Sequence, residues 1–349
     1  MKNRVYLDYN ATAPLRASAR AAMLEAMDLV GNPSSVHAEG RKAKAMLETA
    51  RAQVATALGA VGADVIFTSG ATEATALGLA NASLKCCAIE HDAVTSCCEA
   101  TLDCDAQGLV NVHNSSAVAL QYANSETGVV QSIPKDIGFC DMTQAFGKLP
   151  IAFNWTGAQM AAVSAHKMGG PKGVGALVVK RGTDIQAQIK GGGQEMGRRS
   201  GTENLVGIAG FGAAAASAAK KLESGVWEEI ETLRNFLENT ITEVDPGTII
   251  VSRQLFRLPN TSCLVTPGWK GETQVMQMDL ENIAISAGSA CSSGKVKSSR
   301  VLKTMGFDDI ASSSAIRISL GPETTKDEVL RFLGCWTEKR NNHGLKRAG

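Results

Sequence analysis

Lys167 is the residue with the clearest capacity for covalent chemistry. It stands in the segment Ser164-Ala165-His166-Lys167, and several glycines follow it closely. A lysine amine can form a Schiff base with a carbonyl cofactor, and glycines let a ligand approach the backbone. Taken alone, the segment is more often a loop with a solvated lysine.

Two further segments follow apolar runs and have residues that could bind a ligand. Residues 68–73, Thr-Ser-Gly-Ala-Thr-Glu, open an expected helix whose free N–H groups attract a phosphate. Asp141 begins Asp-Met-Thr-Gln, and a carboxylate at the carboxyl end of a strand lies where open α/β sheets bind ligands. Such a carboxylate could pair with a protonated pyridine nitrogen. It could equally be a turn or helix-capping residue.

Three isolated side chains complete the candidates. His91 follows another expected strand, where a histidine is more often structural than catalytic. Cys291 lies in a loop of small residues, 286–294, so we expect it to be exposed, unlike a core cysteine. Arg317 stands inside an apolar strand, where an arginine needs a carboxylate partner from the protein or from a substrate.

Hydrophobic periodicity predicts the elements that position these residues. Predicted helices alternate with short apolar runs that read as strands, which indicates an α/β domain with a mostly parallel sheet over residues 14–244. The helices cover residues 17–29, 39–58, 204–221 and 227–241, and the strands 65–68, 86–89, 118–122, 160–163 and 175–179. Strands at 249–252 and 262–266, with helices near 272–279 and 325–338, predict a smaller α+β domain formed by residues 1–13 and 245–349.

Composition excludes several classes of protein. Thirty-five Lys and Arg against 34 Asp and Glu give a net charge of +1, which argues against a nucleic-acid partner. The longest weakly polar run, 207–219, is too short to span a membrane, and the N-terminus lacks a signal-peptide core. Nine cysteines, an odd number, favour a reduced, cytoplasmic protein. Their adjacent doublets at 86–87 and 97–98 lack zinc-ligand spacing, so we expect no metal site.

The order and spacing of these motifs resemble the cysteine desulfurases, pyridoxal-phosphate enzymes of fold type I that supply sulfur for iron–sulfur clusters. The resemblance begins with Tyr-Leu-Asp-Tyr-Asn-Ala-Thr-Ala-Pro at 6–14 and Asn-Pro-Ser-Ser-Val-His at 32–37. It continues through the turn at 68–73, the Lys167 motif and residues 191–195 and 199–202, and it ends beyond Arg317. It therefore covers nearly the whole chain. It implies a large domain with a mostly parallel sheet of the seven-stranded type, and a cysteine loop of the long-loop subgroup.

The resemblance also implies roles for the matching positions. Lys167 would hold pyridoxal 5'-phosphate as a Schiff base and act as general base. The ring would be contacted by Asp141 at its nitrogen, Gln144 at its hydroxyl and His91 on its face. The phosphate would be bound by Ala71, Thr72, Ser164 and His166, and Thr202 would reach the phosphate of the partner subunit in a homodimer.

For the substrate, the resemblance implies that Arg317, with Asn32, binds the carboxylate of L-cysteine. Cys291, as a thiolate, would attack the substrate sulfur and leave a persulfide and alanine. The sulfur would then pass to an acceptor or iron–sulfur scaffold protein. Two alternatives stay open: a selenocysteine lyase or aminotransferase of the same fold, and a non-catalytic or weakened relative that binds proteins in sulfur trafficking.

Three features depart from the family's pattern. Ser125 stands where the family usually has an asparagine that contacts the cofactor, with Asn124 beside it. The chain is shorter than the family's usual length, and the shortening is concentrated around residues 100–140. A parallel crossover normally needs a dozen or more residues, so we predict no helix between Gln131 and Asp141. We also predict that Phe139 on this strand loses its cover and that cofactor retention suffers.

Overall fold

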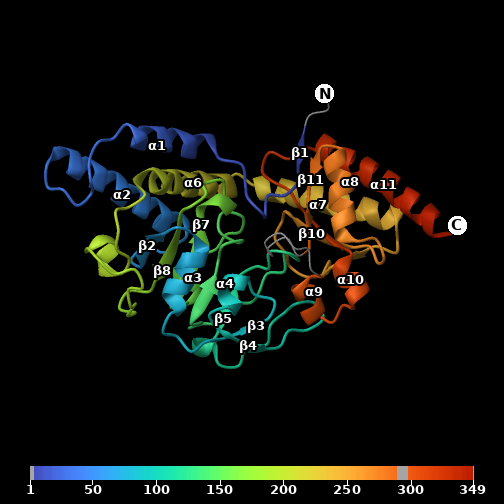
Figure 1. The fold of residues 1–349 in the computed structure, drawn as a ribbon, viewed down its shortest axis with the longest axis horizontal. Helices are drawn as coiled ribbons and strands as arrows, with labels where there is room; N and C mark the ends of the chain where they lie inside the picture. The colour runs from blue at the N-terminus through green and yellow to red at the C-terminus, as the bar shows by residue number, and fades with distance from the viewer. Residues whose placement is uncertain (1–3, 289–297, 349) are drawn as a thin grey trace.

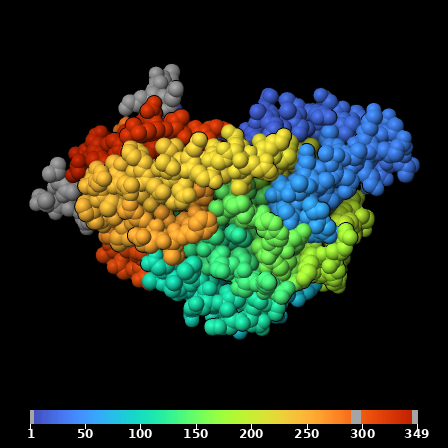
Figure 2. Space-filling model, turned by 180° about the vertical axis from the view of Figure 1, so that it is seen from behind, coloured from blue at the N-terminus to red at the C-terminus, as the bar shows by residue number. Residues whose placement is uncertain are grey.

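The computed structural model describes residues 4–288 and 298–348 (Figure 1). These ranges include every predicted site residue except Cys291, which lies outside the described residues. The α/β part of the chain occupies one end of the elongated molecule and the C-terminal part the other, as both Figure 1 and the rear view in Figure 2 show.

The central sheet is mostly parallel, as predicted. Five strands are hydrogen-bonded in the order β2-β8-β7-β6-β5. The pairs β7–β6 and β6–β5 are parallel, whereas β8 runs antiparallel to both β2 and β7. The parallel pair β3–β4 joins the β5 edge through a bridge between Lys85 and Val118. The strands are β2 (Asp64–Thr68), β3 (Lys85–Cys87), β4 (Glu99–Leu102), β5 (Ala119–Gln121), β6 (Phe139–Asp141), β7 (Met160–Ser164) and β8 (Gly175–Val179).

Helices cover both faces of this sheet. On one face, α6 (Leu205–Glu223) packs against α1 (Ala17–Met27) and α2 (Ala38–Ala57), and its Phe211 meets Phe67 and Phe146 edge to face. On the other face lie α3 (Ala71–Leu79) and the short α4 (Asp92–Thr95). By length and composition α6 could cross a membrane, but half of it is buried, as is usual for a helix in a protein core. A short α5 (Phe153–Thr156) lies between β6 and β7.

Of the two predictions for the shortened region, one is confirmed and the other is wrong. Within the described chain, no helix lies between Gln131 and Asp141, although β5 and β6 still pair in parallel. The prediction that Phe139 loses its cover is wrong: its side chain is fully buried and faces α3. An added Cβ at Gly78 of α3 would lie 3.3 Å from the Phe139 ring, so the helix packs directly on it.

The opposite face of β6 is covered by irregular chain. Val110 and Val112, from the segment between β4 and β5, pack against the same core as Cys140, and so does Ile133 from the shortened connection. These side chains occupy space that a crossover helix would cover, and this explains why the sheet remains buried.

The remaining elements form a second core. The N-terminal strand β1 (Val5–Tyr6) pairs in parallel with β11, and a four-stranded sheet runs in the order β12-β13-β10-β9. The elements are α7 (Val226–Val244), β9 (Ile249–Ile250), β10 (Thr261–Val265), α8 (Gly271–Leu280), β11 (Ile283–Ala284), β12 (Ser286–Ala287), α9 (Arg300–Thr304), α10 (Asp309–Ser313), β13 (Ala315–Ser319) and α11 (Lys326–Ala348). This core includes Trp227 of α7, and the rings of Trp269 and Trp336 lie 5.6 Å apart within it. The domain boundary at 244/245 stays a prediction.

Candidate active site

Most of the predicted site residues line one cavity of about 640 Å³ at the carboxyl end of the central sheet. They come from segments that are far apart in sequence and follow different strands, namely Ala71, Thr72, His91, Ser125, Asp141, Gln144, Ser164, His166, Lys167 and Arg317. Two predicted residues lie elsewhere. Thr202 lines a neighbouring cavity of about 270 Å³, which shares Ser69 and Gly173 with the first. Asn32 lies exposed between α1 and α2, where its Oδ1 accepts a hydrogen bond of 2.9 Å from the Ser34 N–H.

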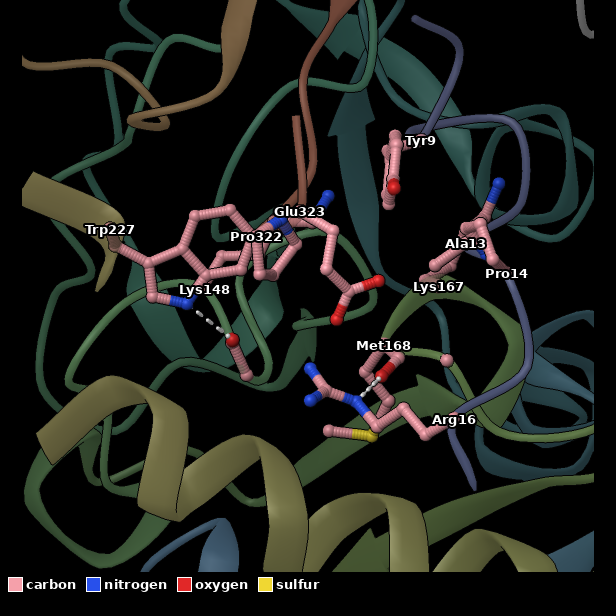
Figure 3. Close-up of a pocket in the computed structure, with 12 residues that line it drawn as sticks. Tyr9, Ala13, Pro14, Arg16, Lys148, Lys167, Met168, Trp227, Pro322 and Glu323 are labelled. Atoms are coloured by element: carbon pink, nitrogen blue, oxygen red, sulfur yellow. Dashed lines mark hydrogen bonds between the residues drawn. The ribbon is translucent and has the colours of Figure 1, made fainter. Parts of the chain in front are cut away.

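Lys167 lies in a short 3₁₀ turn directly after β7. Its Nζ donates to the carbonyl oxygens of Asn10 at 2.7 Å and Ala11 at 2.9 Å. Behind this turn, Arg16 Nε donates to the Met168 carbonyl at 2.7 Å beside a small cavity of about 30 Å³ (Figure 3). The N-terminal segment therefore holds the lysine amine on one side and its loop on the other.

Asp141 and Gln144 follow β6. Asp141 Oδ1 accepts a 2.9 Å hydrogen bond from the Thr143 N–H, and the strand pairs in register with both neighbouring strands. The shortened connection has therefore not displaced this carboxylate. Gln144 Nε2 donates to the Asn10 carbonyl at 3.0 Å, while its Oε1 accepts from Lys148 Nζ at 2.8 Å.

One end of the cavity is suited to a phosphate. Ala71 and Thr72 begin α3, a nine-residue helix whose first N–H groups have no helical acceptor. His166 lines the same cavity, with Nδ1 3.2 Å from Thr12 Oγ1. Burial, together with the nearby Lys167 and Lys172, lowers the pKa of His166 to about 4, so the imidazole is neutral at pH 7. A neutral imidazole still donates one N–H.

Arg317 is suited to a carboxylate. It lies on β13, is 2% exposed, and Nη2 pairs with Asp8 Oδ1 at 2.8 Å. Nη1 donates to the Ser125 carbonyl at 3.2 Å, whereas the buried Nε lacks a hydrogen-bond acceptor among the described atoms. Because buried polar groups are normally paired, the Nε of Arg317 is an unused donor among the described residues.

Ser125 is not replaced by its neighbour. Asn124 Nδ2 donates to the Ile89 carbonyl at 3.0 Å, and its Oδ1 accepts from the N–H groups of Glu126 and Thr127, both at 2.9 Å. The side chain of Asn124 therefore forms its hydrogen bonds within the protein around this turn, and the shorter Ser125 lines the cavity.

His91 caps the N-terminus of α4. Its Nδ1 accepts a 3.1 Å hydrogen bond from the Ala93 N–H, and its ring lines the cavity. The preceding Glu90 is fully buried, and its Oε1 accepts from the Gln121 N–H at 2.7 Å. Burial raises the pKa of Glu90 well above its usual range.

Several residues of the site had no role in the sequence prediction. Asn10 and Thr12 belong to the motif at 6–14, which carried the resemblance without assigned functions. Lys148 follows Gln144 by four residues, the spacing of one helical turn. This spacing was the sequence signal that could have indicated its contact with Gln144. Lys172 also lines the cavity.

The chemistry of these groups fits pyridoxal phosphate. The cavity combines a lysine amine for the aldehyde, a carboxylate for a protonated ring nitrogen and a helix N-terminus for the phosphate. No group of three His, Cys, Asp or Glu side chains suited to a metal ion occurs in the described part of the chain.

Comparison with known proteins agrees with this fit. The sequence matches the family "Aminotransferase class-V" over residues 5–101 and 99–332. It is 36% identical to a cysteine desulfurase of Cereibacter sphaeroides, covering 95% of this chain and 94% of the relative. It is 34% identical to the cysteine desulfurase IscS of Dictyoglomus turgidum, and the match covers 94% of this chain and 92% of the relative.

Solved structures give the same result. A NifS-like protein from Rickettsia africae is 33% identical with a TM-score of 0.89, covering 97% of this chain and all of that one. A second NifS-like protein is 30% identical with a TM-score of 0.88. The fold is thus fold type I, and the chain belongs to the cysteine desulfurases of the pyridoxal-phosphate-dependent class-V aminotransferase family.

Proposed function

We propose that this protein converts L-cysteine to L-alanine and transfers the sulfur to Cys291 as a persulfide. The observation that carries the proposal is the convergence of Lys167, Asp141 and Arg317 on one cavity. The family comparisons support pyridoxal phosphate as cofactor and a cysteine desulfurase activity.

The residues of the cavity have distinct tasks. When bound, the cofactor supplies an electron sink for the substrate Cα–H bond. Lys167 Nζ removes the α-proton, Arg317 binds the substrate carboxylate, and Asp141 keeps the ring nitrogen protonated. Ala71, Thr72, Ser164 and His166 hold the phosphate.

Cys291 then accepts the sulfur. Its thiolate attacks the substrate sulfur, a sulfur–sulfur bond forms, and the bond between that sulfur and the substrate β-carbon breaks. The electron pair of the broken bond remains with the carbon fragment, which is protonated and leaves as alanine. Cys291 lies outside the described residues, so this assignment rests on the sequence motif.

Persulfide labelling with [³⁵S]cysteine tests the proposal. Cys291→Ser should retain bound cofactor but lose protein-bound label, because a serine hydroxyl is a far poorer nucleophile toward sulfur. Cys97→Ser, which changes an exposed cysteine, is the matched control and should label normally. Undiminished labelling of Cys291→Ser would place the acceptor on another cysteine. Keto-acid formation in place of alanine would instead indicate an aminotransferase.

We also propose that the chain acts as a homodimer in which Thr202 reaches the partner's phosphate site. An exposed apolar strip supports this: Leu24, Met27, Val30 and Val36 on α1 and the loop that follows are 45–87% exposed. Sedimentation should show a dimer that Met27→Glu dissociates. Met276→Glu on α8 is the control, since Met276 is 59% exposed and Met27 60%. A monomeric unmodified protein would contradict the proposal.

Finally, we propose that the protein is cytoplasmic and donates its sulfur to an acceptor or iron–sulfur scaffold protein. Eight cysteines in the described part of the chain are free thiols, which supports a reducing compartment. Cell fractionation tests the location. Transfer of the ³⁵S label from the loaded enzyme to a scaffold protein, but not to its cysteine-free variant, tests the donation.

A further inference from the structure

Lys148 is a buried lysine that has no ionic partner among the residues that the structure describes. The residue is 3% exposed. Its Nζ donates to Gln144 Oε1 at 2.8 Å and to Asn10 Oδ1 at 2.9 Å. Both acceptors are neutral amides. Within the described residues no carboxylate lies within ion-pair distance of Nζ, although buried lysines are normally paired.

The surroundings of Lys148 favour its neutral form. Burial, with further contributions from Lys167 and Arg317, lowers the pKa of Lys148 well below its usual range. A neutral amine has two N–H groups, and the structure provides one acceptor for each. The two N–H groups of a neutral Lys148 amine are therefore matched by two acceptors, Gln144 Oε1 and Asn10 Oδ1.

This arrangement fixes the orientation of the Gln144 amide. With Oε1 held by Lys148, Nε2 must take the other side, where it donates to the Asn10 carbonyl at 3.0 Å. That carbonyl also accepts from Lys167 Nζ at 2.7 Å. The Asn10 side chain is fixed in turn, because Asn260 Nδ2 donates to its Oδ1 at 3.1 Å. Lys148 thus connects the cofactor-facing amide to the backbone that holds the catalytic amine.

We propose that Lys148 is a positioning residue that keeps the Gln144 Nε2 group, rather than Oε1, directed at the ring hydroxyl of the cofactor. This inference rests on the proposed function, in which Gln144 contacts that hydroxyl. Without Lys148 only the Asn10 carbonyl holds the amide, so a half-turn that presents an acceptor to an oxygen that needs a donor becomes less unfavourable.

The pH dependence of the holoenzyme's visible absorption tests the proposal. Lys148→Met removes both donors in a side chain of similar length. Loss of a donor to the ring oxygen makes that oxygen more basic, so it retains the adjacent Schiff-base proton more strongly. We expect the absorption transition to move to higher pH by about 0.5–1 unit, the effect of about one hydrogen bond.

Two further variants separate positioning from a general loss of stability. Trp227→Phe removes the 2.9 Å hydrogen bond to the Gly147 carbonyl, next to Lys148, and should lower the melting temperature without moving the transition. In a Gln144→Ala background, Lys148→Met should have no further effect on the transition. Where Lys148→Met does not fold, Lys148→Gln replaces it, since its shorter amide cannot reach both acceptors.

The outcomes are distinct. An unchanged transition in Lys148→Met, or a shift that persists in the Gln144→Ala background, would overturn the positioning role. Unmodified protein without any visible absorption on addition of pyridoxal phosphate would instead refute the proposed function.

Discussion

Replacement of Arg317 by lysine tests substrate recognition most directly. Arg317 Nη2 donates to Asp8 Oδ1 and Nη1 donates to the Ser125 carbonyl. Its buried Nε has no hydrogen-bond acceptor among the described residues. A lysine in its place keeps the positive charge opposite Asp8. It cannot hold Asp8 and a second carboxylate in the fixed, planar geometry of a guanidinium.

The expected loss is that of one charge-assisted hydrogen bond. Such bonds contribute about 1.5–3 kcal/mol, which corresponds to about a 10- to 150-fold loss of kcat/KM for L-cysteine. The loss should depend on the substrate. Cysteamine has the same thiol and amine but no carboxylate, so its kcat/KM should change little.

Initial rates of sulfide release under a thiol reductant, measured with both substrates, provide the assay. Arg257→Lys is the control, because Arg257 is buried in an ion pair with Glu238 at 2.8 Å and does not line the cavity. If Arg317→Lys reduces kcat/KM equally for cysteine and cysteamine, Arg317 supports the structure of the site and does not bind the carboxylate.

Three other predictions follow from the site and the core. Lys167→Ala should abolish both the visible absorption of bound cofactor and alanine release; alanine release at the unmodified rate would exclude Lys167 as the base. Burial raises the pKa of Glu126 to about 7, above its usual 4.5, so stability should fall by up to about 3 kcal/mol as pH rises through this window. Urea unfolding should show that Glu126→Gln, which cannot titrate, reduces this slope by the contribution of Glu126. Phe139→Ala should lower the free energy of unfolding by about 3–5 kcal/mol, and a loss below 1 kcal/mol would mean that α3 does not cover the ring.

The positions of the candidate site residues were predictable from sequence wherever a residue with a reactive or ligand-binding side chain follows a strand. Ser164 ends β7, Asp141 ends β6 and His91 follows β3. The carboxyl ends of parallel strands meet at one edge of the sheet, so strand order alone brings these residues together. No detailed packing was needed for that inference.

Other features depend on contacts that no local pattern encodes. The hydrogen bond between Lys148 and Asn10 joins residues 138 positions apart. The cover over β6 comes from Val110 and Val112, which lie in irregular chain without helical or strand periodicity. Sequence analysis therefore predicted the absence of the crossover helix correctly but could not foresee which side chains would replace it.

The place of the N-terminal segment has a consequence for the order in which the protein matures. Tyr9 and Asn10 donate their N–H groups to the backbone and side chain of Ser319, and the latter pair is separated by 309 positions. Because a ribosome releases the chain from its N-terminus, these first residues emerge long before β13 exists to receive them. The carbonyl oxygens that hold Lys167 are therefore among the last parts of the site to settle. Nascent chains that stop before β13 should be unable to retain the cofactor, however completely the central sheet has formed.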